Sequence, residues 1–338
     1  MSTIHLLNRK SFTATAGTSI LDAARAAGIV LEHSCRTGRC GTCRTQVLEG
    51  NTTTLLAEAG LNAQDRGAGW VLSCARSATS DLRLGSEDLG ALAGIVPRTL
   101  PCRIHSLERL APGVLKVLLR LPPNAQFRYL SGQHINVIAR DGTRRSYSVA
   151  NACHAGEPVG MLELHIRRVD GGAMSRYWFD EARPADLLRF EGPLGTFYLR
   201  ECAGQDLIFL ATGTGIAPIL AMLAELGQRP GGRQPRTVTL LWGGRTPQDL
   251  YLKPELPGLN YVPVLSRTGW PGATGHVQDA LLQSTPALAD CMVYACGSLA
   301  MTDGARAAMH KAGLPSGRFH ADAFVSSAAA ETLVTARH

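Results

Sequence analysis

The sequence lacks several features that would place it in other classes of protein. Its first residues contain no apolar signal segment, so we expect the nine cysteines to stay reduced in the cytoplasm rather than to form disulfides. The chain carries 34 basic and 27 acidic residues, but basic runs interleaved with aromatic residues are absent, which argues against nucleic-acid binding. No internal repeat is visible, so a solenoid is not expected.

Long apolar runs are also scarce. Residues 207–224 are the uncharged run that is long enough to raise the question of a membrane span. Gly213, Gly215 and Pro218 interrupt it near the middle. A strand, a glycine-rich turn and a buried helix explain this pattern better, so no membrane association is expected.

The most informative feature that the chain does have is a set of four cysteines. Cys35, Cys40 and Cys43 form a C-x4-C-x2-C run, and Cys74 follows 31 residues after Cys43. This is the plant-type spacing for a [2Fe-2S] cluster. Two bridged irons need two thiolates each, and three of the four can come from one tight loop. The spacing therefore predicts that these cysteines are metal ligands and that the protein carries electrons one at a time.

The residues between the cysteines support the cluster interpretation. Gly38 and Gly41 allow the loop to turn without a clash at Cβ. A structural zinc site or incidental free thiols are the alternatives. Zinc sites usually pair short C-x2–4-C units symmetrically, whereas here the fourth cysteine is single and distant.

Basic residues surround the cysteine loop. They are Arg36, Arg39, Arg44 and Arg76, and residues 33–48 contain no acidic residue. A basic rim of this kind would suit an acidic patch on an electron-accepting partner. The alternative is that these arginines simply face solvent.

The length of 338 residues suggests two or three domains, and we divide the chain into residues 1–90, 101–203 and 204–326. The first segment predicts an α+β module with a hairpin at 4–7 and 12–14, a helix at 18–27 and strands at 45–48 and 82–84. It resembles the β-grasp roll of plant-type ferredoxins. Residues 85–101 form a connector rich in Gly, Leu and Ala.

The other two segments differ in the order of their predicted strands and helices. Short strands separated by turns predict an antiparallel β-barrel in the second segment. Strands alternating with helices predict a doubly wound parallel α/β sheet in the third. The expected barrel strands are 102–107, 114–121, 134–139, 145–149 and 162–169. The expected α/β elements are strands 206–211, 237–242, 261–265 and 292–295 with helices 218–226, 276–282 and 303–312.

One barrel strand carries side chains suited to a flavin. Its candidate residues are Arg145, Ser146, Tyr147 and Ser148. An arginine can pair with a pyrophosphate, a tyrosine can lie flat on a flavin ring, and a serine hydroxyl can hydrogen-bond the reactive flavin nitrogen. The alternative is an ordinary strand with a polar face.

A glycine pair further along is suited to a phosphate. Gly171 and Gly172 lead into a predicted helix that contains Met174 and Ser175. Backbone N–H groups and a serine hydroxyl at such a turn can hold a phosphate, although a plain capped turn would look the same. The strand before this turn adds His165, Ile166 and Arg167 to the candidate cofactor-binding residues.

A second glycine-rich loop follows a strand and opens a helix, as a nucleotide-binding loop requires. It lacks the third glycine of the Rossmann fingerprint, so it is a different kind of dinucleotide loop. Cys296 and Gly297 end a later strand, at the sheet edge where ligands bind. One more buried thiol is the alternative for Cys296. The candidate loop residues are Thr212, Gly213, Thr214, Gly215 and Pro218.

In this order, the motifs resemble the ferredoxin–NADP reductase superfamily, and within it the iron-sulfur flavoprotein reductases. The resemblance implies that the arginine, tyrosine and serine motif binds FAD, and that Gly172, Met174 and Ser175 hold its phosphates. It implies that the 213–215 loop binds the nicotinamide nucleotide and that Tyr147, Ser148 and Cys296 lie where hydride is transferred. Phe324 resembles the C-terminal aromatic residue that packs near the flavin, although here fourteen residues follow it.

The resemblance also implies a reaction. Hydride from NADH or NADPH would pass to FAD, and single electrons would leave through the cluster to a partner enzyme. Two partners fit the motifs: the dehydrase of CDP-4-keto-6-deoxyglucose C3 deoxygenation, and a terminal oxygenase or ferredoxin of an aromatic-ring dioxygenase system. A redox sensor or simple electron carrier is the rival, and the 213–215 loop argues against it. Arg245 is the candidate cation for a 2′-phosphate, if NADPH is the donor.

Overall fold

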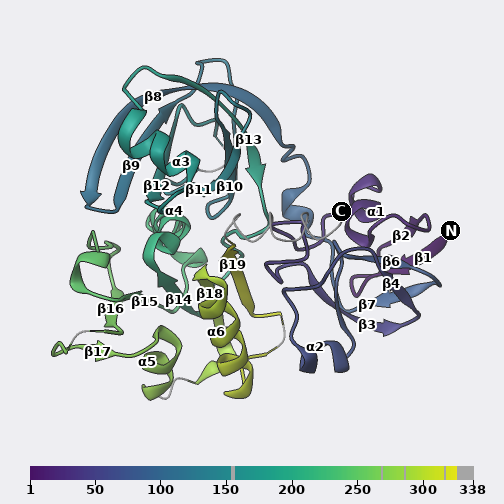
Figure 1. Ribbon diagram of the computed structural model, residues 1–338. Helices are drawn as coiled ribbons and strands as arrows, with labels where there is room; N and C mark the ends of the chain where they lie inside the picture. Colours follow the sequence, from purple (N-terminus) through teal and green to yellow (C-terminus); the bar gives the residue numbers. More distant parts are fainter. Residues whose placement is uncertain (154–156, 268, 285–286, 316, 326–338) are drawn as a thin grey trace. The chain divides into compact units, whose positions relative to one another are not determined.

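The computed structural model describes residues 1–153, 157–267, 269–284, 287–315 and 317–325 (Figure 1). Its contacts divide the chain into two compact units. Among the described residues, one contains Met1–Leu89 with Ser298–Ala300 and Asp322–Val325, and the other lies within Gly90–Gly297 and Met301–Ala321. The three segment boundaries proposed from the sequence remain predictions. Among the described residues, none of the helices combines the length and the apolar character needed to cross a membrane.

The first unit is a mixed sheet with one main helix against it. Its elements are β1 (Ser2–His5), β2 (Ser11–Ala14), α1 (Ile20–Ala26), β3 (Arg44–Glu49), β4 (Thr52–Thr54), α2 (Ala63–Gly67), β5 (Trp70–Leu72), β6 (Arg76–Ala78) and β7 (Leu82–Leu84). The larger sheet has the order β2-β1-β7-β3-β5, in which β1 is antiparallel to β2 and parallel to β7. This confirms the predicted ferredoxin-like module.

Helix α1 shows why the local sequence folds this way. The Ser19 hydroxyl accepts a hydrogen bond from the backbone N–H of Asp22 at 3.0 Å and so caps the first turn. Ile20, Leu21 and Ala24 are buried on one face, against the sheet. Gly28 follows the last turn with φ +73°, the left-handed conformation that ends many helices.

The barrel segment forms one antiparallel sheet in the second unit. Its elements are η1 (Gly90–Leu92), β8 (Arg98–Ala111), β9 (Val114–Arg120), β10 (His134–Ile138), β11 (Arg144–Ser148), β12 (Met161–Arg167), α3 (Ala173–Arg176), η2 (Tyr177–Glu181) and β13 (Leu187–Leu194). The strand order is β11-β10-β13-β8-β9-β12. The edge strands approach each other through a single bridge between Val149 and Leu164, so the barrel is not closed by a continuous ladder. Strand β13 was absent from our prediction.

The third segment is a doubly wound sheet. Its elements are β14 (Asp206–Thr212), η3 (Gly213–Gly215), α4 (Ile216–Leu226), η4 (Gly231–Arg233), β15 (Thr237–Gly244), η5 (Pro247–Asp249), β16 (Leu259–Leu265), β17 (Ala273–Thr274), α5 (Val277–Gln283), η6 (Leu288–Asp290), β18 (Cys291–Ser298), α6 (Leu299–Lys311) and β19 (Phe319–Phe324). The order is β17-β16-β15-β14-β18-β19, with β14 parallel to β15 and β18. Alternate residues of β14 face opposite sides: Phe209 packs with α4, and Ile208 and Leu210 pack with α5 and α6.

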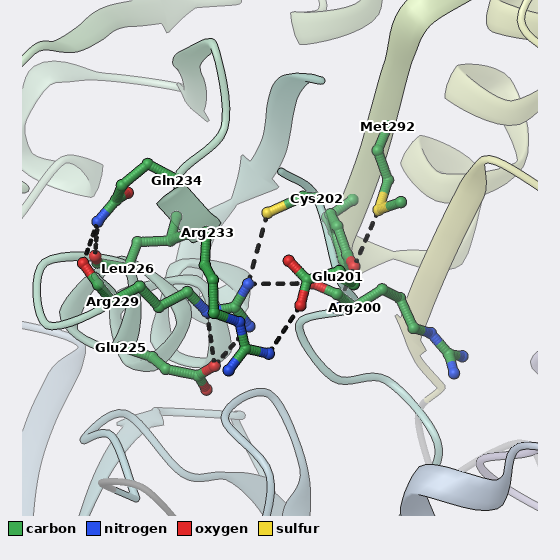
Figure 2. Close-up of polar contacts among 10 residues, drawn as sticks. Arg200, Glu201, Cys202, Glu225, Leu226, Arg229, Arg233, Gln234 and Met292 are labelled. Atoms are coloured by element: carbon green, nitrogen blue, oxygen red, sulfur yellow. Dashed lines mark hydrogen bonds and ion pairs between the residues drawn. The ribbon is translucent and has the colours of Figure 1, made fainter. Parts of the chain in front are cut away.

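Polar contacts fix the connection between the barrel and this sheet (Figure 2). Arg229, just after α4, donates to the carbonyl of Arg200 at 3.3 Å, contacts Cys202 Sγ at 3.6 Å and pairs with Glu225 at 2.6 Å. The backbone N–H of Arg200 donates to the hydroxyl of Tyr294 on β18 at 2.8 Å. The connecting segment is therefore attached both to the C-terminal end of α4 and to strand β18 of the sheet.

Candidate functional site

The four predicted metal ligands lie in two pairs in the first unit. Cys43 Sγ and Cys74 Sγ are 3.2 Å apart. The backbone N–H of Cys40 donates to Cys35 Sγ at 3.4 Å, and that of Cys35 donates to Cys40 Sγ at 3.5 Å. Within the described ranges, no three His, Cys, Asp or Glu side chains gather around a position for a single ion. Two pairs of thiols are the donor set that a two-iron cluster requires.

Close backbone packing explains the glycines of the cysteine loop. A Cβ at Gly38 would lie 2.2 Å from the carbonyl oxygen of Ala57, and one at Gly41 would lie 2.8 Å from that of Gly60. Both glycines also have positive φ, at +73° and +71°. The loop can therefore reach its position beside residues 57–60 only with glycine at these places.

Hydrogen bonds within each pair make one sulfur easier to ionise than the other. The hydrogen bond with Cys40 lowers the pKa of the Cys35 thiol to about 4, against the opposing effect of burial. The same bond, together with burial, raises the pKa of Cys40. The bond between Cys43 and Cys74 likewise raises the pKa of Cys43 and lowers that of Cys74. All four must be thiolates when they bind iron, so cluster binding releases protons.

Arginines of the predicted basic rim have acidic partners from elsewhere in the module, and the role of the rim in docking stays a prediction. Arg36 pairs with Asp22. Arg44 pairs with Asp65, and Arg76 pairs with Glu58 at 2.7 Å. The absence of acidic residues in 33–48 was misleading because these partners are distant in sequence. Their positive charge is largely compensated within the module.

Glu58 is a residue that the sequence analysis missed. Its carboxylate is buried, accepts the backbone N–H of Leu72 at 2.7 Å, and accepts Arg76 through Nε at 3.0 Å and Nη2 at 2.7 Å. Leu72 and Arg76 flank Cys74, so Glu58 holds both sides of the turn that presents the fourth ligand. The available signal was a single acidic residue in the otherwise apolar stretch 55–61.

The predicted flavin residues lie on β11. Arg145 and Tyr147 occupy one face of the strand, and Ser146 and Ser148 the other. The Tyr147 ring is half-buried against Trp178, whose Nε1–H donates to the tyrosine hydroxyl at 3.0 Å. Burial raises the pKa of Tyr147 to about 12, so its hydroxyl keeps its proton at neutral pH. Ser146 donates to Asn136 at 2.7 Å, and Ser148 is buried.

The predicted phosphate turn forms at the start of α3. Gly171 has φ +72°, and a Cβ at Gly172 would lie 3.1 Å from the carbonyl oxygen of Val169. The Ser175 hydroxyl accepts the backbone N–H of Val169 at 2.9 Å, which closes the turn, and Met174 is buried beside it. The first N–H groups of a helix lack intrahelical partners, and a phosphate held by them remains a prediction for this turn.

The three candidates on β12 are used differently from one another. Ile166 is buried in the barrel core. His165 is also buried, and both of its ring nitrogens lie within hydrogen-bonding distance of protein groups, Glu163 and Tyr251. The Arg167 side chain is half-exposed and lies beside Gly213.

The predicted nucleotide loop leaves the carboxyl end of β14 and meets the end of β18. A Cβ at Gly215 would lie 2.1 Å from the carbonyl oxygen of Cys296. A Cβ at Gly297, which has φ +152°, would lie 2.1 Å from Thr212 Oγ1. The structure therefore brings the two predicted motifs together, and glycine at both positions permits the approach. Pro218 is buried in the first turn of α4, after Thr214 and Gly215.

Three further candidates have less support. The Cys296 side chain is fully buried in the core on the α4 side of the sheet, so its contact with a nicotinamide remains a prediction. Arg245 is exposed after β15, where its backbone N–H donates to Asp249 at 2.9 Å. Phe324 is the last residue of β19 and is 40% exposed. Its place near a flavin also remains a prediction.

Comparison with known proteins agrees with this arrangement. The chain matches the 2Fe-2S iron-sulfur cluster binding domain over residues 5–79, the oxidoreductase FAD-binding domain over 101–198 and the oxidoreductase NAD-binding domain over 209–307. It is 39% identical over 324 residues to the CDP-6-deoxy-L-threo-D-glycero-4-hexulose-3-dehydrase reductase of Yersinia pestis, covering 94% of this chain and 96% of the relative. The chain belongs to the iron-sulfur flavoprotein reductases.

Other relatives of this reductase serve different systems. Reductase component 1 of terephthalate 1,2-dioxygenase from Comamonas is 34% identical over 327 residues, covering 94% of this chain and 95% of the relative. The ferredoxin reductase of carbazole 1,9a-dioxygenase shares the fold with a TM-score of 0.66 and 24% identity, over 96% of this chain and 98% of the other. The reductase is thus an NAD(P)H-dependent oxidoreductase that uses FAD and a [2Fe-2S] cluster.

Proposed function

We propose that this reductase delivers electrons from NAD(P)H to a CDP-6-deoxy-4-hexulose-3-dehydrase. The observation that carries the proposal is 39% identity over 324 residues to the reductase of that dehydrase, with nearly complete coverage of both chains. The reductase component of an aromatic-ring dioxygenase is the second candidate. It is favoured by 34% identity over a similar length to the terephthalate dioxygenase reductase.

Bound FAD supplies the conversion of one hydride, which carries two electrons, into two single electrons. The residues of this chain bind and orient the groups. Arg145 and Tyr147 on β11 would hold the flavin, and the turn at Gly172 would hold its phosphates. The loop at Gly215 would hold the dinucleotide. Cys35, Cys40, Cys43 and Cys74 would each supply one thiolate to the cluster.

The choice of partner is tested by reconstitution. The holo-reductase is mixed with NADH and either purified CDP-6-deoxy-4-hexulose-3-dehydrase with its CDP-sugar, or purified terephthalate 1,2-dioxygenase with terephthalate. We expect deoxygenated sugar to form in proportion to the NADH consumed, and no more than background hydroxylation. Faster turnover with the oxygenase would overturn the proposal in favour of the second candidate. Cytochrome c reduction in parallel shows that the reductase itself is active.

The nucleotide preference depends on a cation near the 2′ position, and we infer that Arg245 supplies it if NADPH is used. Its side chain is exposed beyond β15, at the carboxyl edge of the sheet. Replacing Arg245 with Ala should then raise the KM for NADPH about tenfold and leave that for NADH unchanged. Equal changes for both nucleotides would remove Arg245 from the 2′-phosphate site.

We also propose that the partner docks beside the cluster and that the reductase works in the cytoplasm. Nine free cysteines support a reducing compartment. Arg36, Arg44 and Arg76 form ion pairs within the module, which supports docking without a strong positive patch. We therefore expect partner turnover to fall less than tenfold between 50 and 300 mM salt. A steeper fall in the steady-state rate would indicate that charge controls docking.

A further inference from the structure

A hydrogen-bonded bridge joins the FAD-binding barrel to the nucleotide-binding sheet within the second unit. His165 on β12 is buried, with Nδ1 3.0 Å from the Tyr251 hydroxyl and Nε2 2.9 Å from Glu163 Oε1. Tyr251 follows η5, in the segment that connects β15 and β16 of the nucleotide-binding sheet. The tyrosine and histidine rings also meet edge to face at 5.5 Å. One imidazole therefore connects the two halves of the unit.

The chemistry of Glu163 fixes the direction of its hydrogen bond with His165. Burial favours the neutral form of Glu163, but the hydrogen bond and charge of His165, with Lys116 nearby, outweigh it and lower the pKa of this carboxyl. An ionised carboxylate only accepts, so His165 Nε2 carries the proton. The other ring nitrogen, Nδ1, forms the second hydrogen bond, with the Tyr251 hydroxyl. Burial raises the pKa of Tyr251, which keeps the hydroxyl proton in place.

The bridge continues to the nucleotide loop. The Tyr251 ring packs edge to face on Trp242, with centroids 5.1 Å apart. Trp242 Nε1 donates to the carbonyl oxygen of Gly213 at 3.0 Å. A single side chain, that of Trp242, thus links Tyr251 to the loop that would hold the dinucleotide.

A second contact from the same strand supports the other side of the loop. Arg167 lies two residues after His165, and its Nη1 occupies the space 2.7 Å from where a Cβ of Gly213 would be. Its Nη2 is 3.8 Å from Asp249, whose other oxygen accepts the backbone N–H groups of Arg245 and Thr246. Strand β12 therefore contacts both the loop and the segment that follows β15.

These contacts are distinct from the connection shown in Figure 2, which attaches the C-terminal end of α4. The bridge acts near the N-terminal end of α4, where the loop lies. Two separated attachments restrict rotation of the sheet on the barrel far more than a single attachment would. The sheet is thereby held in one orientation on the barrel.

We propose that His165 is a positioning residue for hydride transfer: through Tyr251 and Trp242 it fixes the nucleotide loop relative to the FAD-binding barrel. This proposal rests on the proposed function, in which hydride passes from the nucleotide to FAD. Hydride transfer depends steeply on the separation of the nicotinamide carbon and the flavin nitrogen, and a misplacement of about 1 Å can cost on the order of a hundredfold in rate. That His165 binds the cofactor directly stays a prediction; the bridge adds an indirect role.

The test is Tyr251→Phe in the holo-reductase, which removes one hydroxyl and keeps the ring on Trp242. Anaerobic stopped-flow measurement at saturating NADH should show flavin reduction slowed about tenfold. FAD content, cluster absorbance and melting temperature should stay close to those of the wild type. The primary isotope effect with NADH deuterated at the transferred position should also change. Tyr261→Phe on β16 makes the same chemical change away from the bridge and should leave the rate unchanged.

Other outcomes overturn the proposal. An unchanged rate at saturating NADH, or a raised KM alone, would mean that the bridge does not set the hydride distance. Loss of FAD in proportion to activity would give Tyr251 a purely structural role. In that event Trp242→Phe, which removes the hydrogen bond to Gly213 together with part of the buried indole, should still slow flavin reduction several-fold in the molecules that retain FAD. Failure of the wild type to reduce its flavin with NADH would instead refute the function itself.

Discussion

The cluster loop and the nucleotide loop are both glycine-rich turns pressed against a second backbone segment, yet they offer different atoms to their ligands. The cluster loop presents sulfur atoms of side chains, and its glycines lie against residues 57–60. The nucleotide loop is predicted to present backbone N–H groups, and Gly215 lies against Cys296. A loop that binds through side chains is specified by its own sequence. One that binds through its backbone depends on the segments packed around it.

The largest effect should come from removing one side-chain ligand. Cys74→Ser replaces a thiolate with a hydroxyl, which is a poor ligand for the iron of a cluster. We expect loss of iron and sulfide, and a fall in NADH–cytochrome c activity of about a hundredfold or more. Flavin reduction by NADH should persist, because the flavin and nucleotide sites lie in the other unit.

The control for this variant is Cys291→Ser. Cys291 is a buried thiol of the second unit whose Sγ donates to the Ala287 carbonyl at 3.1 Å, a bond that serine can keep. It should retain its cluster and its cytochrome c activity. If Cys74→Ser kept a normal cluster spectrum, the assignment of the fourth ligand would be wrong.

The next largest effect is on stability, and a pair of glycine variants separates the cost of backbone strain from the cost of a packing clash. Gly28 and Gly38 share φ +73°, but a Cβ at Gly28 meets nothing within 4 Å, whereas one at Gly38 would lie 2.2 Å from the Ala57 carbonyl. Gly28→Ala should cost only the left-handed strain, about 1–2 kcal/mol. Gly38→Ala adds a clash with backbone, so it should cost at least about 2 kcal/mol more and lower the iron content. Thermal unfolding and iron analysis check both, and equal losses would contradict the packing argument.

The comparison also explains what could be predicted from the sequence. The cysteine ligands and strand β7 were predictable because spacing and alternation are local properties. Glu58 was missed because its partners, Leu72 and Arg76, are 14 and 18 residues away. The acidic partners of the rim arginines were missed for the same reason, since Asp22 and Asp65 lie outside the loop.

At the nucleotide site too, contacts between residues distant in sequence could not be predicted. Its glycines were found because they follow a strand and open a helix. The bridge from His165 to Tyr251 spans 86 residues and joins two different sheets. No periodicity along the chain relates such residues, so only the folded structure reveals them. Strand β13 was missed because Gly192 and Pro193 fall within it, and both residues are uncommon in strands.

A moderate effect is expected from the backbone-binding loop. Gly215 has φ −61°, which any residue tolerates, so Gly215→Ala tests only the approach to Cys296. We expect the KM for NADH to rise about tenfold, equivalent to about 1.4 kcal/mol, with FAD and iron contents unchanged. Gly227→Ala, at the other end of α4, has only ordinary contacts from 3.5 Å and should match the wild type. Steady-state kinetics measure both, and equal KM values for the two variants would contradict the prediction.

The smallest effect should appear at the opposite end of β14 from the nucleotide loop. Asp206 accepts Arg236 Nε at 2.9 Å and the Thr237 hydroxyl at 2.7 Å. The hydrogen bond from Arg236 outweighs burial and lowers the pKa of Asp206 from its ordinary 3.8. Because the folded-state pKa is depressed, the resulting stability is present above the unfolded value, about 3.9, and is lost as pH falls through the folded value.

Asp206→Asn should therefore lower the free energy of unfolding by up to about 1 kcal/mol at pH 7, since Arg236 is half-exposed. The difference from the wild type should shrink as the pH falls below about 4, and the KM for NADH should not change. Chemical unfolding at several pH values measures it. A difference that stayed constant down to pH 3 would show that the asparagine acts through packing rather than charge. A raised KM would show instead that the two ends of β14 are coupled, which the rigid parallel pairing of β14 with β15 and β18 argues against.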